Sequence, residues 1–336
     1  MTGYSLLDLV PIIEGGDASL ALAHAADLAR QAEQSGYNRY WVAEHHGMPG
    51  IASAATSVVI GHIAGATKTI RVGAGGIMLP NHAPLVIAEQ FGTLDALYPG
   101  RIELGLGRAP GSDQTVSRAL RRALESDPQQ FPRDVMELQS YFADDGQTGV
   151  RAVPGGGAKV PLWILGSSLF GAQLAAALGL PYAFASHFAP AALDQAIAIY
   201  RRDFKPSAQL SKPHVMLGFN VIAADSDEEA EYLATSQQQA FVAIRTGRAI
   251  KLPPPVAGYR DTLGAHGNAV LDQVLECSAI GSRETVARGL AAFIERTGAD
   301  ELMLTGGIYD AEKRRRSFAL AAEAMQSLGA QAAAAE

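Results

Sequence analysis

Three polar residues interrupt an apolar run near the start of the chain. Residues 41–50 read WVAEHHGMPG, in which an aromatic and aliphatic segment stops at Glu44, His45 and His46. A polar triplet at the tip of a buried strand is typical of the catalytic end of an α/β enzyme, where an imidazole can manage protons. Because strand side chains alternate between two faces, at most one histidine is expected to face a central pocket. The alternative is a pair of loop histidines satisfied by backbone groups.

A guanidinium follows a glycine-rich strand end further along the chain. Arg108 comes after Gly105 and Gly107, so a permanent positive charge emerges with little bulk beside it. This geometry and charge suit a phosphate group. A structural salt bridge from Arg108 to Asp113 or Glu103 is the competing explanation.

A second segment suited to an anion lies between an expected strand and an expected helix. Gly166, Ser167 and Ser168 combine free backbone N–H groups at a helix start with two short hydroxyls. Simple capping of the helix by Ser167 or Ser168 is the alternative, and it is compatible with phosphate binding. The hypothesis therefore requires Arg108 to lie near this turn.

Glycines Gly73, Gly75 and Gly76 lie where a third strand is expected to open into the same region. Without side chains, their backbone offers a surface that a flat ring can approach closely. Barrel curvature or a bulge explains the same glycines equally well.

Other cofactor motifs are missing from the sequence. No GxGxxG opens the first helix and no GxxxxGK[ST] occurs, so neither a dinucleotide-binding fingerprint nor a Walker loop is indicated. No HExxH occurs, and Glu44, His45 and His46 are adjacent rather than at helical ligand spacing, so no metal site is predicted.

Composition limits the class of protein. The chain has 336 residues, of which 48% are hydrophobic and 18% charged, which fits either two ordinary domains or one large α/β barrel. Its net charge of −7 argues against a nucleic-acid partner. The single cysteine, Cys277, excludes an internal disulfide, and no apolar run approaches the length of a membrane helix. We therefore expect a cytoplasmic protein with no membrane partner.

Strand and helix patterns alternate along the chain and favour the barrel. The expected strands are 5–10, 38–44, 70–79, 101–107, 161–166, 181–186, 214–223 and 301–306. A helical pattern follows each strand, including a long one over 113–143. This alternation predicts an α/β protein with a (β/α)8 TIM barrel over residues 1–330 as a single domain, because the carboxyl ends of its strands bring distant segments to one mouth.

Two segments depart from the alternation. Residues 247–268 contain three consecutive prolines and several glycines, so we expect no regular structure there. This insertion between the seventh and eighth strands is either a mobile lid or surface decoration. A further helix is expected over 283–297, and residues 331–336 are expected to be a frayed tail.

The chain resembles the luciferase-like flavin-dependent monooxygenases, the family that includes bacterial luciferase. The most specific matches are WVAEHHG at 41–47, the segment 72–111, and LGSS with ASHF at 165–168 and 185–188. The resemblance spans nearly the whole chain and implies a barrel that binds FMN at its mouth, with reduced flavin supplied by a separate reductase.

The resemblance also implies roles for particular residues. His45 and Glu44 match the catalytic pocket, and Gly75 with Gly76 match a place where the family often has a cis peptide bond beside the flavin ring. Arg108 matches a phosphate-binding arginine, and Gly166, Ser167 and Ser168 match the phosphate cradle. The reactive cysteine of luciferase is here Gly107, which weakens a luminescence role but not oxygenation in general.

Three functions stay open at this point. The first is a two-component monooxygenase that uses reduced FMN and O2 on an unknown small organic substrate. The second is hydride transfer with FMN or, less favoured, a deazaflavin and a nicotinamide or alcohol. The third is a non-catalytic flavin-binding protein.

A stripe of small residues recurs every four positions at Ser53, Ser57, Gly61 and Gly65. Such a stripe permits close approach of another helix, either from a second copy or from the same barrel. Because the family resemblance implies dimerisation through this region, we expect a homodimer.

Overall fold

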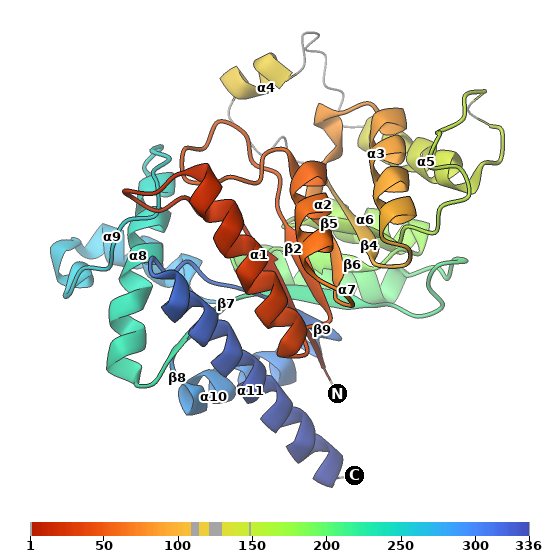
Figure 1. Cartoon of the computed structure of the whole chain (residues 1–336). Helices are drawn as coiled ribbons and strands as arrows, with labels where there is room; N and C mark the ends of the chain where they lie inside the picture. Colours follow the sequence, from red (N-terminus) through yellow and green to blue (C-terminus); the bar gives the residue numbers. More distant parts are fainter. Residues whose placement is uncertain (1, 109–113, 121–129, 148, 336) are drawn as a thin grey trace.

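The computed structural model of the chain describes residues 2–108, 114–120, 130–147 and 149–335. Within these residues, parallel strands form a sheet in the order β6-β5-β4-β3-β2-β1-β9-β7-β8, and pairing of β6 with β7 closes all except β8 into an eight-stranded barrel (Figure 1). The strands are β1 (Gly3–Asp8), β2 (Arg39–Val42), β3 (Arg71–Met78), β4 (Ile102–Gly107), β5 (Leu162–Gly166), β6 (Tyr182–Phe184), β7 (Val215–Ala224), β8 (Ser278–Ser282) and β9 (Glu301–Thr305). The predicted (β/α)8 barrel is confirmed.

Helices surround the strands (Figure 1). They are α1 (Ala18–Gln34), α2 (Thr56–Ala66), α3 (Pro84–Leu97), α4 (Gln114–Leu120), α5 (Gln130–Ala143), α6 (Leu169–Leu178), α7 (Leu193–Asp203), α8 (Asp227–Arg245), α9 (Ala265–Val274), α10 (Arg283–Thr297) and α11 (Ala311–Ala335), with short 3-10 turns η1 (Leu79–Asn81), η2 (Pro190–Ala192) and η3 (Tyr259–Thr262). Side chains of Asp17 and Ser226 accept capping hydrogen bonds at the starts of α1 and α8, and left-handed Gly179 and Gly298 end α6 and α10.

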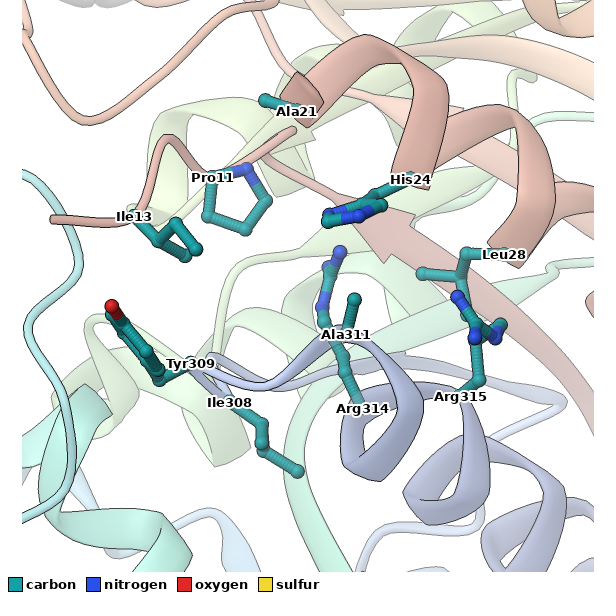
Figure 2. A pocket seen from close by; sticks show the side chains of 10 residues that line it. All are labelled: Pro11, Ile13, Ala21, His24, Leu28, Ile308, Tyr309, Ala311, Arg314 and Arg315. Atoms are coloured by element: carbon teal, nitrogen blue, oxygen red, sulfur yellow. The ribbon is translucent and has the colours of Figure 1, made fainter. Parts of the chain in front are cut away.

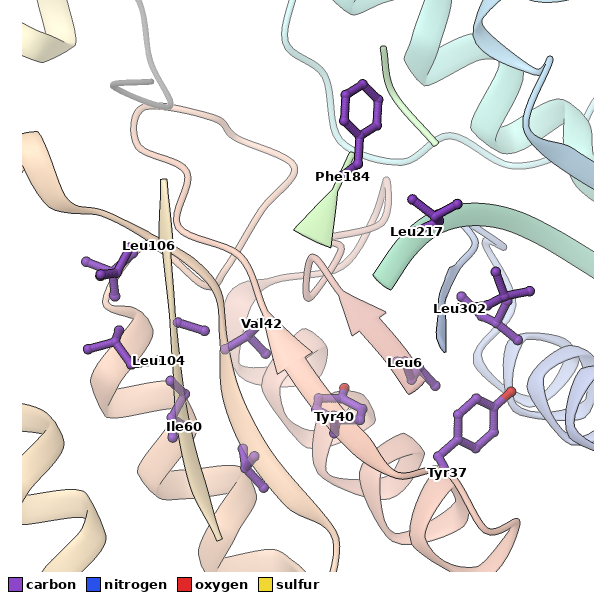
Figure 3. Packing of buried hydrophobic residues seen from close by; sticks show 14 of the residues in the cluster. Leu6, Tyr37, Tyr40, Val42, Ile60, Leu104, Leu106, Phe184, Leu217 and Leu302 are labelled. Carbon is purple, nitrogen blue, oxygen red and sulfur yellow. The ribbon is translucent and has the colours of Figure 1, made fainter. Parts of the chain in front are cut away.

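The core has an outer layer and a barrel interior, because side chains alternate along each strand. Leu6, Tyr40 and Val42 are fully buried in the outer layer, between the strands and the helices (Figure 3). Their sequence neighbours Leu7 and Trp41 belong to a separate cluster inside the barrel. That interior cluster contains Leu7, Trp41, Ala43, Trp163, Ala183, Met216 and Met303.

A buried ionic cluster closes the barrel at the amino ends of its strands. The guanidinium of Arg39 lies between two carboxylates: its Nε donates to Glu103 at 2.8 Å and its Nη1 to Glu301. The Ser5 hydroxyl also donates to Glu301, and the Trp41 indole N–H donates to Glu103 at 3.1 Å. These side chains satisfy one another where water is excluded, so the cluster serves as the floor of the barrel.

The carboxylate of Glu301 in this cluster is expected to make the folded protein less stable in acid. Burial alone raises the pKa of Glu301, but hydrogen bonds and charge from His214, Arg39 and Ser5 outweigh burial and lower the pKa to about 2, from 4.5. The contribution of Glu301 to stability is therefore complete above pH 4.5 and disappears as the pH falls towards 2, with a size of about 3 kcal/mol.

Urea unfolding of the wild type and a Glu301→Gln variant across this pH window measures the effect. We expect the wild type to be more stable at pH 6 and the two free energies of unfolding to converge near pH 2. Substitution of the exposed Glu295 by glutamine is the matched control and should leave the curve unchanged. A constant difference between wild type and Glu301→Gln at all pH values would contradict the assignment.

The structure differs from the predicted elements in two places. Strand β8 was not expected; it is only five residues long and pairs along Asn220–Ala224 of β7, outside the closed barrel. The region 247–268 contains η3 and the start of α9, because its prolines end at Pro255 and nothing then prevents helical turns. The helical pattern expected over 113–143 is found as α4 and α5 in the described residues, and residues 113 and 121–129 lie outside the described part.

The C-terminal segment also differs from expectation. Helix α11 continues to Ala335, so residues 331–335 are helical rather than frayed. Alanine has the highest intrinsic helix propensity, and the helix is already nucleated by its packed first turns.

Candidate active site at the barrel mouth

The carboxylate of Glu44 connects the tip of β2 to the segment that follows β3. It is 1% exposed and accepts hydrogen bonds from the Met78 N–H at 2.9 Å and the Asn81 amide at 3.1 Å. Nε2 of His46 lies 2.7 Å from one carboxylate oxygen, and Nε2 of His82 lies 2.9 and 3.0 Å from the two oxygens. Four groups therefore converge on one buried carboxylate.

The ionisation of Glu44 fixes the hydrogens of its partners. Burial raises the pKa of the carboxyl, but hydrogen bonds and charge from His82, followed by His46 and the Met78 N–H, leave the pKa below its usual value. An ionised carboxylate only accepts hydrogen bonds, so both imidazoles present an N–H at Nε2. Glu44 thus holds two histidines in a defined orientation at the mouth.

The two neighbouring histidines have different partners, although β2 ends at Val42 and strand alternation therefore does not extend to them. His46 turns to Glu44, whereas His45 interacts electrostatically with His187, which follows β6. Sequence reasoning did not select His82 or His187. Both were visible as polar residues just after predicted strand ends, in LPNH and ASH, but neither has a neighbour in sequence that marks it.

The peptide bond between Gly75 and Gly76 is cis, at the position that the family resemblance implied. The carbonyl of Gly76 accepts a hydrogen bond from the Glu44 N–H at 3.2 Å. A Cβ added to Gly75 would lie 2.9 Å from Leu7 and 3.0 Å from Trp41, and one on Gly76 would lie 2.7 Å from the Gly105 carbonyl oxygen. Tight packing inside the barrel therefore requires glycine at both positions. This supports the explanation in which these glycines serve the shape of the barrel rather than a flat ring.

The structure brings Arg108 close to the turn at 166–168. Gly107 and Leu165 are register partners on the adjacent strands β4 and β5. The exposed Arg108 guanidinium lies 4.2 Å above the ring of Phe170, which is on the first turn of α6. An exposed cation and a helix N-terminus thus share one rim of the mouth.

Of the competing explanations for this rim, the structure tests the salt bridge to Glu103 and the capping by Ser168, but not the salt bridge to Asp113. Glu103 is at the floor, where it binds Arg39, and Asp113 lies outside the described residues. Ser168 is the N-cap residue of α6, but its hydroxyl makes no capping hydrogen bond. A Cβ added to Gly166 would come no closer than 3.9 Å to another atom, so packing does not explain this glycine. A bound group can therefore accept hydrogen bonds from the N–H groups in the first turn of α6. It can also form hydrogen bonds with the exposed hydroxyls of Ser167 and Ser168.

Residues 250–256, the first part of the predicted insertion, are tied to the loop after β1 and to α8. The Leu252 N–H donates to Ile12 at 2.9 Å, and the Leu252 carbonyl accepts from Glu14 at 2.8 Å. Thr235 of α8 accepts from the Val256 N–H at 2.8 Å. This part is therefore anchored on both sides, and the lid role stays a prediction.

A small pocket lies between α1, α11 and the segments that follow β1 and β9. Figure 2 shows it between α1 and the start of α11, where His24 lies near Arg314 and Arg315. Arg314 donates to the buried Asp8 carboxylate at 2.7 Å, so this arginine is committed to the structure. None of the predicted site residues lines this pocket.

The described residues contain neither a helix suited to span a membrane nor a cluster suited to hold a metal ion. In residues 2–108, 114–120, 130–147 and 149–335, no helix has the length and apolar character needed to span a bilayer. In the same part of the chain, no group of three or more histidine, cysteine, aspartate or glutamate side chains is arranged to hold a metal ion.

The sequence profile of the luciferase-like monooxygenases matches residues 6–301. The chain belongs to the luciferase-like monooxygenase family. It is 56% identical over 326 residues to a luciferase-like monooxygenase of Escherichia coli strain K12, covering 97% of each chain. It is 32% identical over 337 residues to the N-acetyl-S-alkylcysteine monooxygenase of Bacillus subtilis strain 168, covering 97% of this chain and 98% of that one.

Solved structures of the luciferase-like fold agree with the architecture. The crystal structure of apo-MsnO8 aligns with a TM-score of 0.90 and 34% identity, covering 97% of this chain and 99% of that one. The oxygenating component of 3,6-diketocamphane monooxygenase from Pseudomonas putida, in complex with FMN, aligns with a TM-score of 0.71 at 18% identity, covering 95% and 96% of the two chains, which shows the shared fold alone.

Proposed function

We propose that this protein is the oxygenating component of a two-component, FMN-dependent monooxygenase that acts on a small organic substrate with O2. The observation that carries the proposal is the shared rim of Arg108 and the α6 N-terminus, which offers a guanidinium, free N–H groups and two hydroxyls to one phosphate. A separate reductase would supply the reduced flavin. The oxygenating component of 3,6-diketocamphane monooxygenase, whose structure contains FMN, has the same fold and supports the choice of cofactor.

The residues of the mouth suit a flavin ring next to the phosphate rim. When bound, reduced flavin supplies the activation of dioxygen. In our proposal, Arg108 and the Ser167–Ser168 turn hold the phosphate, and Gly75 with Gly76 keeps the mouth free of side chains. His45 holds or moves a proton at its imidazole, while Glu44 orients His46 and His82. Residues 247–268 would exclude water from the reacting atoms.

Titration with oxidised FMN, reduced FMN and a reduced deazaflavin tests the cofactor. We expect tight binding of reduced FMN under anaerobic conditions, followed by reoxidation on mixing with O2 that differs in rate from that of free reduced FMN. Failure to bind any reduced flavin would leave only a non-catalytic or unrelated role. Reoxidation identical to that of free flavin would also count against the monooxygenase.

Hydride transfer is the alternative outcome of the same experiment. An F420-dependent secondary alcohol dehydrogenase shares the fold at 18% identity and a TM-score of 0.71. Anaerobic bleaching of bound oxidised flavin by a nicotinamide or an alcohol, or preference for the deazaflavin, would favour this second function over oxygenation.

We also propose a homodimer, although the small-residue stripe no longer supports it. A Cβ on Gly61 would contact Leu94 at 3.4 Å, and one on Gly65 would lie 3.0 Å from the Tyr98 hydroxyl, so α2 uses these glycines to pack against α3 and the residue that follows it. The better support is the apolar outer surface of these two helices, on which Val58 is 71% and Leu97 is 63% exposed.

A charge on this surface should disrupt the dimer. We expect Val58→Glu to shift the protein from dimer to monomer in light scattering at micromolar concentration, because an unpaired carboxylate would be buried at the interface. Tyr232→Glu, on the exposed side of α8, is the control and should leave the mass unchanged. A wild-type monomer would disprove the dimer, and a Val58→Glu dimer would place its interface elsewhere.

A further inference from the structure

The imidazole of His187 occupies a space inside the barrel that Gly218 leaves. Along β7, Met216 points into the barrel interior, so alternation places Gly218 on the same side. A Cβ on Gly218 would overlap with Nδ1 of His187, and Cε1 and Cγ are the next nearest atoms. The Nδ1 edge of the ring therefore lies against bare backbone of β7, above the apolar interior cluster.

His187 faces His45 across the mouth. In the closed barrel, β2 and β6 are separated by three strands on one side and three on the other, so their tips are on opposite walls. Gly218 places the His187 ring inside the barrel, and His45 is close enough to interact with it electrostatically. Both residues follow strands at the carboxyl end of the barrel, the end at which Arg108 and the start of α6 lie.

The backbone of His187 is fixed by a chain of amides. Its carbonyl accepts from the Asn220 side chain at 2.7 Å, whose oxygen accepts from Gln237 at 2.7 Å. The oxygen of Gln237 in turn accepts from the Gly307 N–H at 2.9 Å. This chain joins the segments after β6 and β9 to β7 and α8, so the ring is positioned by three neighbouring elements.

The buried edge determines which nitrogen carries hydrogen. Nδ1 of His187 is buried and makes no hydrogen bond among the described residues. A hydrogen on Nδ1 would be a buried donor without an acceptor, which is costlier than an unused lone pair. The neutral Nε2–H tautomer is therefore favoured. Protonation is opposed in the same way, and burial, with a smaller contribution from His45, lowers the pKa of His187 to about 4. Gly218 lies against Nδ1, Cε1 and Cγ, so the Cδ2–Nε2 side is the edge of the ring that it leaves uncovered.

We propose that His187 is a permanently uncharged hydrogen-bond donor of the reacting site, whose Nε2–H binds a carbonyl oxygen of the flavin ring opposite His45. This assignment rests on the proposed function, because it requires a flavin at the mouth. It separates the two imidazoles by role: His45 exchanges protons, whereas His187 stabilises negative charge on an oxygen without giving up its own proton.

Nitrogen-15 NMR of histidine-labelled protein tests the tautomer without any cofactor. We expect a neutral His187 with hydrogen on Nε2 throughout pH 5.5–8, assigned by the signal lost in His187→Leu. Hydrogen on Nδ1, or a charged ring at pH 6, would overturn the proposal. Addition of reduced FMN should then move the Nε2–H resonance. An unmoved resonance on wild-type protein that binds reduced FMN would also overturn it, while leaving the proposed function intact.

Three variants test the hydrogen bond by affinity for reduced FMN. His187→Leu should bind about tenfold more weakly, the value of one hydrogen bond to a partly charged oxygen. His187→Gln keeps a donor and should recover most of the affinity. Gly218→Ala keeps the imidazole but displaces it, so it should weaken binding if His187→Leu fails to fold. Equal affinity in all three variants and the wild type would contradict the proposal, and absence of binding in the wild type would instead refute the flavin site itself.

Discussion

An Arg108→Gln variant is expected to bind reduced FMN about 10- to 150-fold more weakly than the wild type, which corresponds to a lost charge-assisted hydrogen bond of about 1.5–3 kcal/mol. The guanidinium is exposed and makes no ion pair with a carboxylate in the part of the chain that the structure describes, and its ring contact with Phe170 places it beside the start of α6. It can therefore turn its donors to a phosphate without breaking a structural bond.

Anaerobic fluorescence titration with reduced FMN and reduced riboflavin makes this prediction specific. Riboflavin lacks the phosphate, so its affinity should be nearly equal in the wild type and in Arg108→Gln. Arg30→Gln, on the exposed side of α1, is the control for a change in total charge and should affect neither ligand. Equal loss of affinity for FMN and riboflavin would show that Arg108 does not contact the phosphate.

The free energy of unfolding should fall by about 3–5 kcal/mol in a Glu44→Leu variant, because four polar groups would lose their shared acceptor in a buried site. The carboxylate of Glu44 is 1% exposed and holds His46, His82, Asn81 and the Met78 N–H. Without the Glu44 carboxylate, the segment after β3 should also lose its attachment to the tip of β2. We therefore expect the activity of the variant to fall by more than its loss of folded protein alone would cause.

Glu44→Gln separates charge from shape in the same site. Glutamine keeps one acceptor oxygen but adds an NH2 group where donors already converge, so we expect a smaller loss of stability than in Glu44→Leu. Because the pKa of Glu44 is lowered in the folded protein, its contribution is present above the unfolded pKa and is lost as the pH falls towards the folded value. Urea unfolding at pH 7 and pH 4 measures both effects. A Glu44→Leu protein as stable as the wild type would contradict this account.

The histidines at the barrel mouth show which site residues could be predicted from the sequence and which could not. Strand alternation predicted that at most one of His45 and His46 would face a central pocket; the two have different partners, but β2 ends at Val42, so alternation is not the reason. The same reasoning could not find His82 or His187, because each gains its partner from another strand: His82 from Glu44 and His187 from Gly218. A contact between residues that are distant in sequence leaves no local pattern.

The glycines show the opposite case, in which a local pattern had two explanations. Gly61 and Gly65 could serve close packing against a second copy or within the same barrel, and they make room for α3 and Tyr98 of the same chain. Gly75 and Gly76 were related to a flavin ring, and the structure shows that Trp41 and Gly105 also require them. A missing side chain indicates that something approaches closely, but only the fold identifies what it is.

The sequence by itself determined the barrel, the places of its strand ends and the presence of polar residues there, because hydrophobic periods of two and 3.6 residues are local properties of the chain. The tertiary structure alone decided which polar groups meet. It placed Arg108 beside α6, surrounded Glu44 with donors from two loops and set His187 opposite His45. Barrel closure sets these distances, since it joins strands through pairings, such as β6 with β7 and β1 with β9, that no short segment encodes.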